Sequence, residues 1–169
     1  MDIHFRQANQ TDAAAIWTIL QHAILRRKNE GSTQWQDGYP NPEIVNNDIL
    51  KGAGYVLAQE NQILGYTAVY FNDEPAYENI QGKWLTNNDF LVVHRIAIGE
   101  SQTGKGLAKM ILKYVEELAL EKNIYSIKAD TNYDNLPMLR IFESLGYQYC
   151  GEVFFRGSPR KAFEKILKP

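Results

Sequence analysis

The chain has 169 residues, which is enough for one domain with a substantial hydrophobic core. Hydrophobic residues make up 44% of the chain and charged residues 22%, the balance of an ordinary globular protein. The formal net charge of −2 gives no basic field that would attract nucleic acid or a membrane surface, and no apolar run is long enough to cross a membrane. We therefore expect a single domain over residues 1–169 that binds neither nucleic acid nor a membrane.

The sequence contains one cysteine, Cys150, so neither an internal disulfide nor a cysteine-based zinc site is possible. The first residues, Met-Asp-Ile-His-Phe-Arg, lack the apolar core of a signal peptide. Both features fit a cytoplasmic protein, and we expect no bound metal.

The first half of the chain predicts three strands and two helices before a long loop. Alternation of apolar and polar side chains predicts a short strand over residues 3–6. Residues 9–28 begin with polar capping side chains, continue with an apolar helix face and end in basic residues, which predicts a helix. A second helix is expected over Pro42–Leu50, followed by a β-hairpin with arms Tyr55–Gln59 and Ile63–Phe71.

Two polar segments between these elements carry aromatic side chains. Residues 31–42 are rich in turn formers yet include Trp35 and Tyr39, which need a covering surface. Residues 72–88 are too long for a tight turn, and loops of this length are often functional. Each segment is either a surface loop whose aromatic residues close the edge of the core or part of a binding site, and both interpretations stay open.

The most informative stretch joins a strand to a helix. The apolar run Phe90–Ile98 predicts a buried strand, and apolar residues from Leu107 onward recur at the spacing of one helix face. Between them, Gly104 and Gly106 flank Lys105. A helix that begins at glycines presents unpaired N–H groups at its positive end and lets a phosphate oxygen come close. The stretch is therefore a candidate phosphate-binding loop.

The same residues also match part of a nucleotide-binding motif. Gly99 to Lys105 fits the start of the P-loop, G-x-x-x-x-G-K, but the next residue is Gly106 where a Ser or Thr hydroxyl would hold magnesium. A nucleoside triphosphatase is therefore disfavoured, and a generic nucleotide-binding α/β domain is kept only as a weaker alternative.

The last third of the chain predicts a strand, a helix and two further strands. The strand is expected over Ile124–Asp130, and Asp134 or Asn135 can cap the helix, which Gly146 would end. Residues 147–155 are apolar and aromatic enough for a strand. The C-terminal segment fits helix or strand on its pattern alone, and we expect a strand.

Residues 96–109 resemble motif A of the GCN5-related N-acetyltransferase (GNAT) family. In this motif an apolar strand end is followed by [QR]-x-x-G-x-[GA] at a helix start, here Thr103 to Ala108, and Thr103 departs from the usual Gln or Arg. The resemblance implies that acetyl-CoA binds here, with its pyrophosphate on the helix-start amides and its pantetheine arm along the strand edge. The implied cofactor-binding residues are Ile96, Ala97, Ile98, Thr103, Gly104, Lys105, Gly106, Leu107, Ala108 and Lys109.

Residues 135–147 resemble motif B of the same family, N-x-x-[AM]-x-x-x-Y-x-x-x-G-[FY]. Asn135 matches the Asn that contacts the pantetheine region in the family, and it is a further implied cofactor-binding residue. The family's Tyr, which is thought to protonate the departing CoA thiolate, is replaced by Phe142. Another donor such as Tyr147, Tyr149 or a water then supplies the proton, or the thiolate leaves unaided.

The two motifs occur in the family's order, and the resemblance covers essentially the whole chain. It implies an α/β (α+β) fold, the GNAT acyl-CoA N-acyltransferase fold, with a mixed central sheet of about seven strands and four helices. In that fold the segment between the first two helices helps to form the acceptor pocket. Trp35 and Tyr39 are therefore candidate substrate-binding residues.

Acetyl transfer to an amine needs a group that takes up a proton, and two residues are candidate catalytic bases. Asp130 ends a predicted strand where the resemblance implies a catalytic carboxylate, although it could equally be a cap or turn partner. His94 lies in the central strand, and an unperturbed histidine titrates at about 6.5, which suits base work. A lone strand histidine is more often structural. With regular alternation, His94 would share a face with Ile96 and Ile98.

We expect an acetyl-CoA-dependent N-acetyltransferase that acetylates a primary amine, on a small molecule or a protein. Transfer is expected to be direct, in a ternary complex, because an isolated buried thiol such as Cys150 is usually inert. The main alternative is a CoA-binding sensor or interaction module that has lost catalysis, which Thr103 and Phe142 would favour. Exposed strand edges also make a homodimer an expectation.

Overall fold

The computed structural model describes residues 2–169, and Met1, which belongs to the predicted domain, lies outside the described residues. The chain divides into two compact units. The first unit contains the residues up to Val69 together with Arg95–Leu112, and the second contains Tyr70–His94 and Lys113–Pro169.

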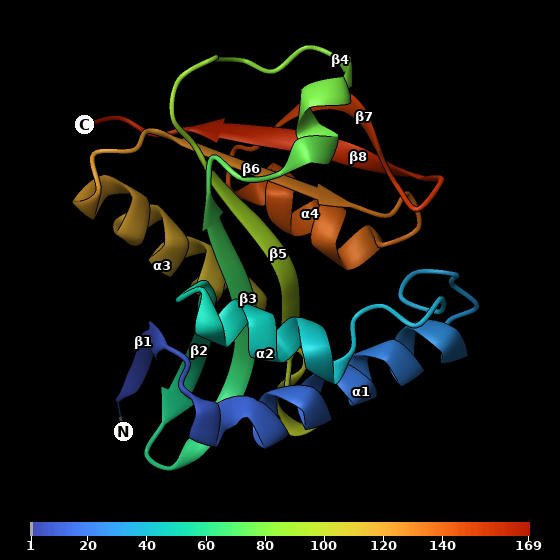
Figure 1. Ribbon diagram of the computed structural model, residues 1–169, viewed down its shortest axis with the longest axis vertical. Coiled ribbons are helices and arrows are strands. Elements are labelled where there is room, and N and C mark those ends of the chain that lie inside the picture. Colours follow the sequence, from blue (N-terminus) through green and yellow to red (C-terminus); the bar gives the residue numbers. More distant parts are fainter. Residues whose placement is uncertain (1) are drawn as a thin grey trace. The chain divides into compact units, whose positions relative to one another are not determined.

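The described residues form eight strands, four α-helices and three short 3-10 helices (Figure 1). The strands are β1 (Ile3–Gln7), β2 (Gly54–Gln59), β3 (Gln62–Phe71), β4 (Gln81–Gly82), β5 (Leu91–Ile98), β6 (Ser126–Thr131), β7 (Gln148–Phe155) and β8 (Ser158–Ile166). The helices are α1 (Ala13–Asn29), α2 (Pro42–Leu50), α3 (Leu107–Glu121) and α4 (Leu136–Ser144), with 3-10 helices η1 (Gln10–Asp12), η2 (Pro75–Asn79) and η3 (Glu100–Gln102).

The strands form one mixed sheet in the order β1-β2-β3-β5-β6-β8-β7-β4. Strands β5 and β6 run parallel, which requires a crossover, and α3 is that crossover. The pairs β1–β2, β2–β3, β6–β8, β7–β8 and β4–β7 are antiparallel. The predicted α/β fold and its order of elements are confirmed, including the C-terminal strand, and the two-residue strand β4 raises the number of strands from about seven to eight.

The first unit is built around α1 and α2, which lie side by side in Figure 1. Asn9 and Asp12 form a capping box ahead of α1, in which the Asn9 N–H donates to the Asp12 carboxylate at 2.9 Å. Asn41 caps α2 by accepting from the Ile44 N–H at 3.0 Å. The buried core of this unit consists of Ala8, Ile16, Ile19, Leu20, Ala23, Val45, Val56, Tyr66 and Ala97.

In the second unit, the long segment between β3 and β5 is tied to strands β7 and β8. Strand β4 pairs with β7 so closely that a Cβ at Gly82 would lie 2.2 Å from the Cys150 carbonyl oxygen. Glu164 of β8, which is fully buried, accepts from the Leu85 N–H and from the Thr86 hydroxyl, each at 2.7 Å. The segment over residues 72–88, which the sequence predicted only as a long loop, therefore has defined contacts with β7 and β8.

Candidate active-site residues

The start of α3 in the first unit has the backbone of an anion-binding loop. Gly104 and Gly106 have φ angles of +79° and +76°, a conformation that L side chains rarely adopt. A Cβ built at either glycine would have no heavy atom within 4 Å, so the space beside both is open. The Met110 N–H donates to the Gly106 carbonyl at 3.1 Å, and by helix geometry the earlier N–H groups have no partner further back in the helix. The residues present therefore fit the phosphate groups of acetyl-CoA.

Polar contacts hold the residues just before this helix. The Thr103 hydroxyl donates to the Glu100 carbonyl at 3.3 Å, and the Lys105 ammonium donates to the Gln102 side chain at 3.2 Å. Thr103 thus stabilises the turn, while its neighbour Gln102 positions a positive charge beside the glycines. The departure of Thr103 from the motif leaves the loop ordered.

The end of β5 approaches β3 closely in the first unit. A Cβ at Gly65 would lie 2.9 Å from the Ile98 side chain and 3.2 Å from the Ala97 carbonyl oxygen, so glycine is required at this crossing. Arg95 has a φ of +56°, which interrupts the extended backbone of β5. The regular alternation expected from His94 to Ile98 therefore does not hold, because it assumed an unbroken strand.

Arg95 is the centre of a buried polar cluster in the first unit. Its guanidinium donates to both carboxylate oxygens of Asp48, from Nε at 3.1 Å and from a terminal nitrogen at 2.6 Å. The other terminal nitrogen donates to the Tyr39 hydroxyl, and the Tyr66 hydroxyl donates to Asp48 at 2.5 Å. Burial opposes the charged form of Arg95, but Tyr39 and Asp48 outweigh it and raise the pKa of Arg95 above its ordinary value. We call Tyr39, Asp48, Tyr66 and Arg95 the Arg95 cluster.

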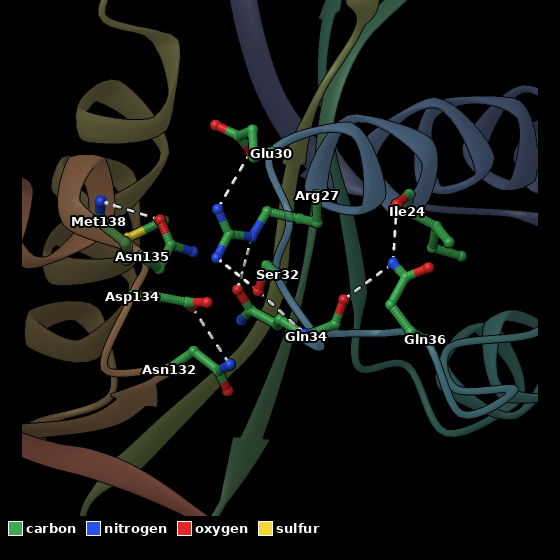
Figure 2. A network of polar contacts seen from close by, with 10 residues as sticks. All are labelled: Ile24, Arg27, Glu30, Ser32, Gln34, Gln36, Asn132, Asp134, Asn135 and Met138. Carbon is green, nitrogen blue, oxygen red and sulfur yellow. Dashed lines mark hydrogen bonds and ion pairs between the residues drawn. The ribbon is translucent and has the colours of Figure 1, made fainter.

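The two candidate substrate-binding residues of the first unit lie in different settings. Trp35 has a φ of +63° and packs against the buried core, so its side chain closes the core edge. Tyr39 is half-buried and belongs to the Arg95 cluster. Figure 2 shows that Arg27 of α1 contacts Glu30, Ser32 and Gln34, with distances of 2.8–3.0 Å. These contacts hold the segment between α1 and Trp35.

His94 lies beside a carboxylate in the second unit. Its Nε2 is 2.7 Å from Glu74 Oε2, and the two side chains are 13% and 15% exposed. The rings of Tyr70, Tyr77 and Phe155 surround the imidazole, with centroids 6.5, 6.2 and 6.1 Å away. The candidate base His94 is therefore held by Glu74, which lies in the segment before β5. The sequence did not identify Glu74 as a candidate.

Asp130, the other candidate base, receives a hydrogen bond from the same segment. The hydroxyl of the buried Tyr77 donates to Asp130 Oδ2 at 2.6 Å. Desolvation raises the pKa of Asp130 above its usual range, although His94, Tyr77 and Arg160 act in the opposite direction. We call Glu74, Tyr77, His94 and Asp130 the His94 cluster.

Motif B begins with a structural contact in the second unit. Figure 2 shows the Asn135 side chain capping α4, where its Oδ1 accepts from the Met138 N–H at 3.3 Å. Phe142, which replaces the family's Tyr, is 1% exposed and packs on Tyr147 and Phe163. Burial raises the pKa of Tyr147, which makes it a poor proton donor.

Sequence reasoning missed Glu74, Tyr77, Asp48 and Arg95. Glu74 and Tyr77 lie in a segment whose sequence indicated only a loop. Asp48 lies in a short helix that was predicted from the spacing of its apolar residues alone. One signal was available: a negative charge and an aromatic hydroxyl in a long loop next to the central strand. Pairing them with His94 and Asp130 required the tertiary structure.

Solved structures with the same architecture define the class of protein. The structure superposes on a GNAT family acetyltransferase of Streptococcus agalactiae with a TM-score of 0.91 and 35% identity, covering 99% of this chain and 96% of that one. It also superposes on a Salmonella typhimurium protein solved with acetyl-CoA, with a TM-score of 0.70 and 17% identity, covering 100% of this chain and 96% of that one. The fold is that of the acyl-CoA N-acyltransferases.

The sequence comparison then gives the family. Residues 15–147 match the profile described as the acetyltransferase (GNAT) family, and the chain belongs to that family. As a member it is an N-acetyltransferase, and acetyl-CoA is the family's acetyl donor. Streptothricin acetyltransferase of Escherichia coli is 24% identical over 66 residues, which are 39% of this chain and 38% of that relative's length.

Among residues 2–169, no three His, Cys, Asp or Glu side chains are grouped so that they could hold a metal ion. None of the helices in this described part of the chain is both long and apolar enough to span a membrane.

Proposed function

We propose that residues 1–169 form one N-acetyltransferase domain that moves the acetyl group of acetyl-CoA directly to a primary amine in a ternary complex. The observation that carries this proposal is the start of α3, where Gly104 and Gly106 combine left-handed φ angles with open space. Glycines at these two positions let phosphate oxygens approach the main-chain N–H groups at the helix start.

The donor side of the proposed site lies in the first unit. The amides from Gly104 to Lys109 would bind the pyrophosphate, and the ammonium of Lys105, placed by Gln102, adds a positive charge. The main chain of residues 96–98 would pair with the pantetheine arm and donate to the developing oxyanion. In the second unit, Asn135 stays a proposed cofactor-binding residue on the resemblance to motif B, in addition to capping α4.

Bound acetyl-CoA supplies an acetyl thioester: the amine nitrogen bonds to its carbonyl carbon, and the carbon–sulfur bond breaks to release CoA. The amine must lose a proton, and we assign its uptake to His94. Asp130 is the second catalytic residue of the proposal, a carboxylate that stabilises the positive charge on the imidazole. Because Phe142 has no proton to donate and Tyr147 is a poor acid, we propose that neither of them protonates the CoA thiolate, which leaves unaided or takes a proton from Tyr149 or a water.

The acceptor is proposed to be a primary amine, on a small molecule or a protein. Tyr39 is the better supported of the two substrate-binding candidates, because Trp35 packs against the core. Streptothricin, for which the partially matched relative is named, is a rational first compound for a panel of amines. A raised KM for the amine in Tyr39→Phe, with KM for acetyl-CoA unchanged, would support the role of Tyr39, and an unchanged KM for the amine would remove it.

Two coarser proposals accompany the activity. We propose a cytoplasmic location, which the single cysteine Cys150 suits. We also propose a homodimer, since β1 and β4 are the edges of the sheet and an edge strand can pair with a second copy. Sedimentation at micromolar concentration checks the dimer, and a monomer there would remove it.

The test is thermal unfolding with acetyl-CoA, followed by CoA release with a panel of amines. At a hundred times its dissociation constant a ligand adds about 2.7 kcal/mol to the unfolding free energy. At this chain length that raises the midpoint by roughly 5–11 °C. Gly106→Glu should abolish the shift, because its side chain fills the open space and its charge repels phosphate.

Gly157→Glu is the matched control for this variant. Gly157 has a φ of +77° and equally open surroundings, but it lies in the turn between β7 and β8. It should keep the full acetyl-CoA shift. A shift without CoA release for any amine would favour the sensor alternative, and no shift in the unmodified protein would remove both.

A further inference from the structure

Glu74 is fixed by both of its carboxylate oxygens. Oε1 accepts from the Ala76 N–H at 3.1 Å and so caps the 3-10 helix η2, whose first residue is Pro75. Oε2 lies 2.7 Å from His94 Nε2. Because the cap holds one oxygen, the other cannot turn away from the imidazole without breaking a main-chain hydrogen bond.

The imidazole of His94 is enclosed by groups from several elements of the second unit. Glu74 contacts it from the start of η2, and Tyr77 from the same helix places its ring 6.2 Å away. Asp130 of β6 interacts with it electrostatically, and Arg160 of β8 acts on the same carboxylate. Tyr70 of β3 is a further titratable group, with its ring 6.5 Å from the imidazole.

A carboxylate is a hydrogen-bond acceptor only, so the contact with Glu74 requires the proton of the neutral imidazole to lie on Nε2. The lone pair of the ring then lies on Nδ1. We propose that Glu74 is a positioning residue of the acetyl transfer, which fixes this tautomer and assigns Nδ1 as the atom that takes the proton from the amine. The inference rests on the proposed function, and it deepens the role of His94.

Glu74→Gln is a sharp test because the cap dictates how the new amide must turn. The glutamine Oε1 can still accept from the Ala76 N–H, and a reversed amide would place a donor against that donor. The amide NH2 group therefore faces His94 and donates to Nε2, which moves the ring proton to Nδ1. Size and cap are preserved, while the tautomer is inverted.

Glu78→Gln is the matched control, since Glu78 is exposed on the same 3-10 helix. It makes the same chemical change and removes the same charge from the same segment. It should leave the midpoint of unfolding, the tautomer of His94 and the kinetics unchanged.

The first measurement is the tautomer itself, by long-range proton–nitrogen NMR on protein labelled with nitrogen-15 histidine. The chain has three histidines, so the spectrum is readily assigned with His94→Gln. The neutral ring of His94 should carry its proton on Nε2 in the unmodified protein and on Nδ1 in Glu74→Gln. A proton on Nδ1 in the unmodified protein would overturn the proposal, whether or not an active amine has been found.

The second measurement is the pH profile of CoA release. Glu74→Gln should lower kcat at neutral pH by about 10²-fold, the range of lost base catalysis, with KM for acetyl-CoA unchanged. An unchanged profile with an inverted tautomer would show that Glu74 is merely structural. No turnover in the unmodified protein would instead remove the proposed function and leave the tautomer result standing.

Discussion

Strand β5 carries two neighbouring side chains, His94 and Arg95, that each contact a carboxylate from another element. Arg95 meets Asp48 through two hydrogen bonds, and these side chains are only 7% and 1% exposed. His94 meets Glu74 through one contact. The His94 side chain is 13% exposed, about twice the exposed fraction of the Arg95 side chain. An arginine stays protonated at all physiological pH values, whereas a histidine exchanges its proton near neutrality.

The comparison separates a scaffold from a site that can do chemistry. The Arg95 cluster joins α2, β3, β5 and the segment that carries Tyr39, and its charge is permanent. It stabilises the left-handed backbone at Arg95, which an arginine adopts only when its surroundings hold it there. The His94 cluster contains groups that can take up and release protons. We expect loss of Asp48 from the first cluster to act on stability and loss of His94 from the second to act on rate.

The largest effect is expected for His94→Gln, which removes the proposed base. We expect kcat to fall by about 10²–10⁴-fold, because general base catalysis contributes that range. The midpoint of unfolding should change little, since the glutamine amide can still donate to Glu74. Steady-state CoA release and thermal unfolding measure the two quantities. His22→Gln is the control, at a position of α1 where the histidine side chain is 43% exposed. A variant at His94 that keeps more than a tenth of kcat would transfer the role of base to Asp130.

Asp48→Ala tests the scaffold half of the comparison. Removing one partner of a buried ion pair leaves the Arg95 guanidinium uncompensated, which costs about 3–5 kcal/mol of unfolding free energy. At this chain length the midpoint should fall by roughly 6–20 °C. Glu30→Gln, which breaks the pair of Arg27 with a 47% exposed carboxylate, should cost at most about 1 kcal/mol. Equal losses in the two variants would contradict the scaffold role.

The smallest effect, and one of opposite sign, is expected for Asp130→Asn. The pKa of Asp130 is raised on folding, so the native state binds more protons than the unfolded state, and stability is lost as pH rises through the folded pKa. The substitution should therefore raise the midpoint of unfolding at pH 7, and the gain should vanish below about pH 4, where unfolded carboxyls are protonated.

Asp12→Asn should change stability in the opposite direction. The hydrogen bond from Arg6 lowers the pKa of Asp12, so its contribution is present above the unfolded pKa and is lost as pH falls through the folded pKa. This variant should be less stable than the unmodified protein at pH 7, and the difference should shrink in acid. Midpoints measured from pH 3 to pH 8 give both curves. If Asp130→Asn is also destabilising at pH 7, burial does not control that carboxylate.

The sequence predicted the fold because its local signals agree with its tertiary contacts. Asn9 caps the short helix η1 that leads into α1, and Asn135 caps α4, as the capping residues predicted, and the apolar periods match the observed strands and helices. Gly104 and Gly106 have left-handed φ angles that favour glycine, in the loop before α3 where the sequence predicted a phosphate-binding site. Their role in binding acetyl-CoA stays a prediction. The strand β4 was missed, because two residues carry no periodicity.

The sequence by itself determined the order of elements, the family motifs and the two candidate bases, since each depends on residues close together in the chain. Only the tertiary structure decided what holds those bases, because Glu74 is 20 residues from His94 and Tyr77 is 53 residues from Asp130. The same is true of Arg95 and Asp48, which are 47 residues apart. A single side chain carries no sign in the sequence of a partner that is many residues away. The charges that folding brings within a few ångströms decide whether that side chain can bind or release a proton.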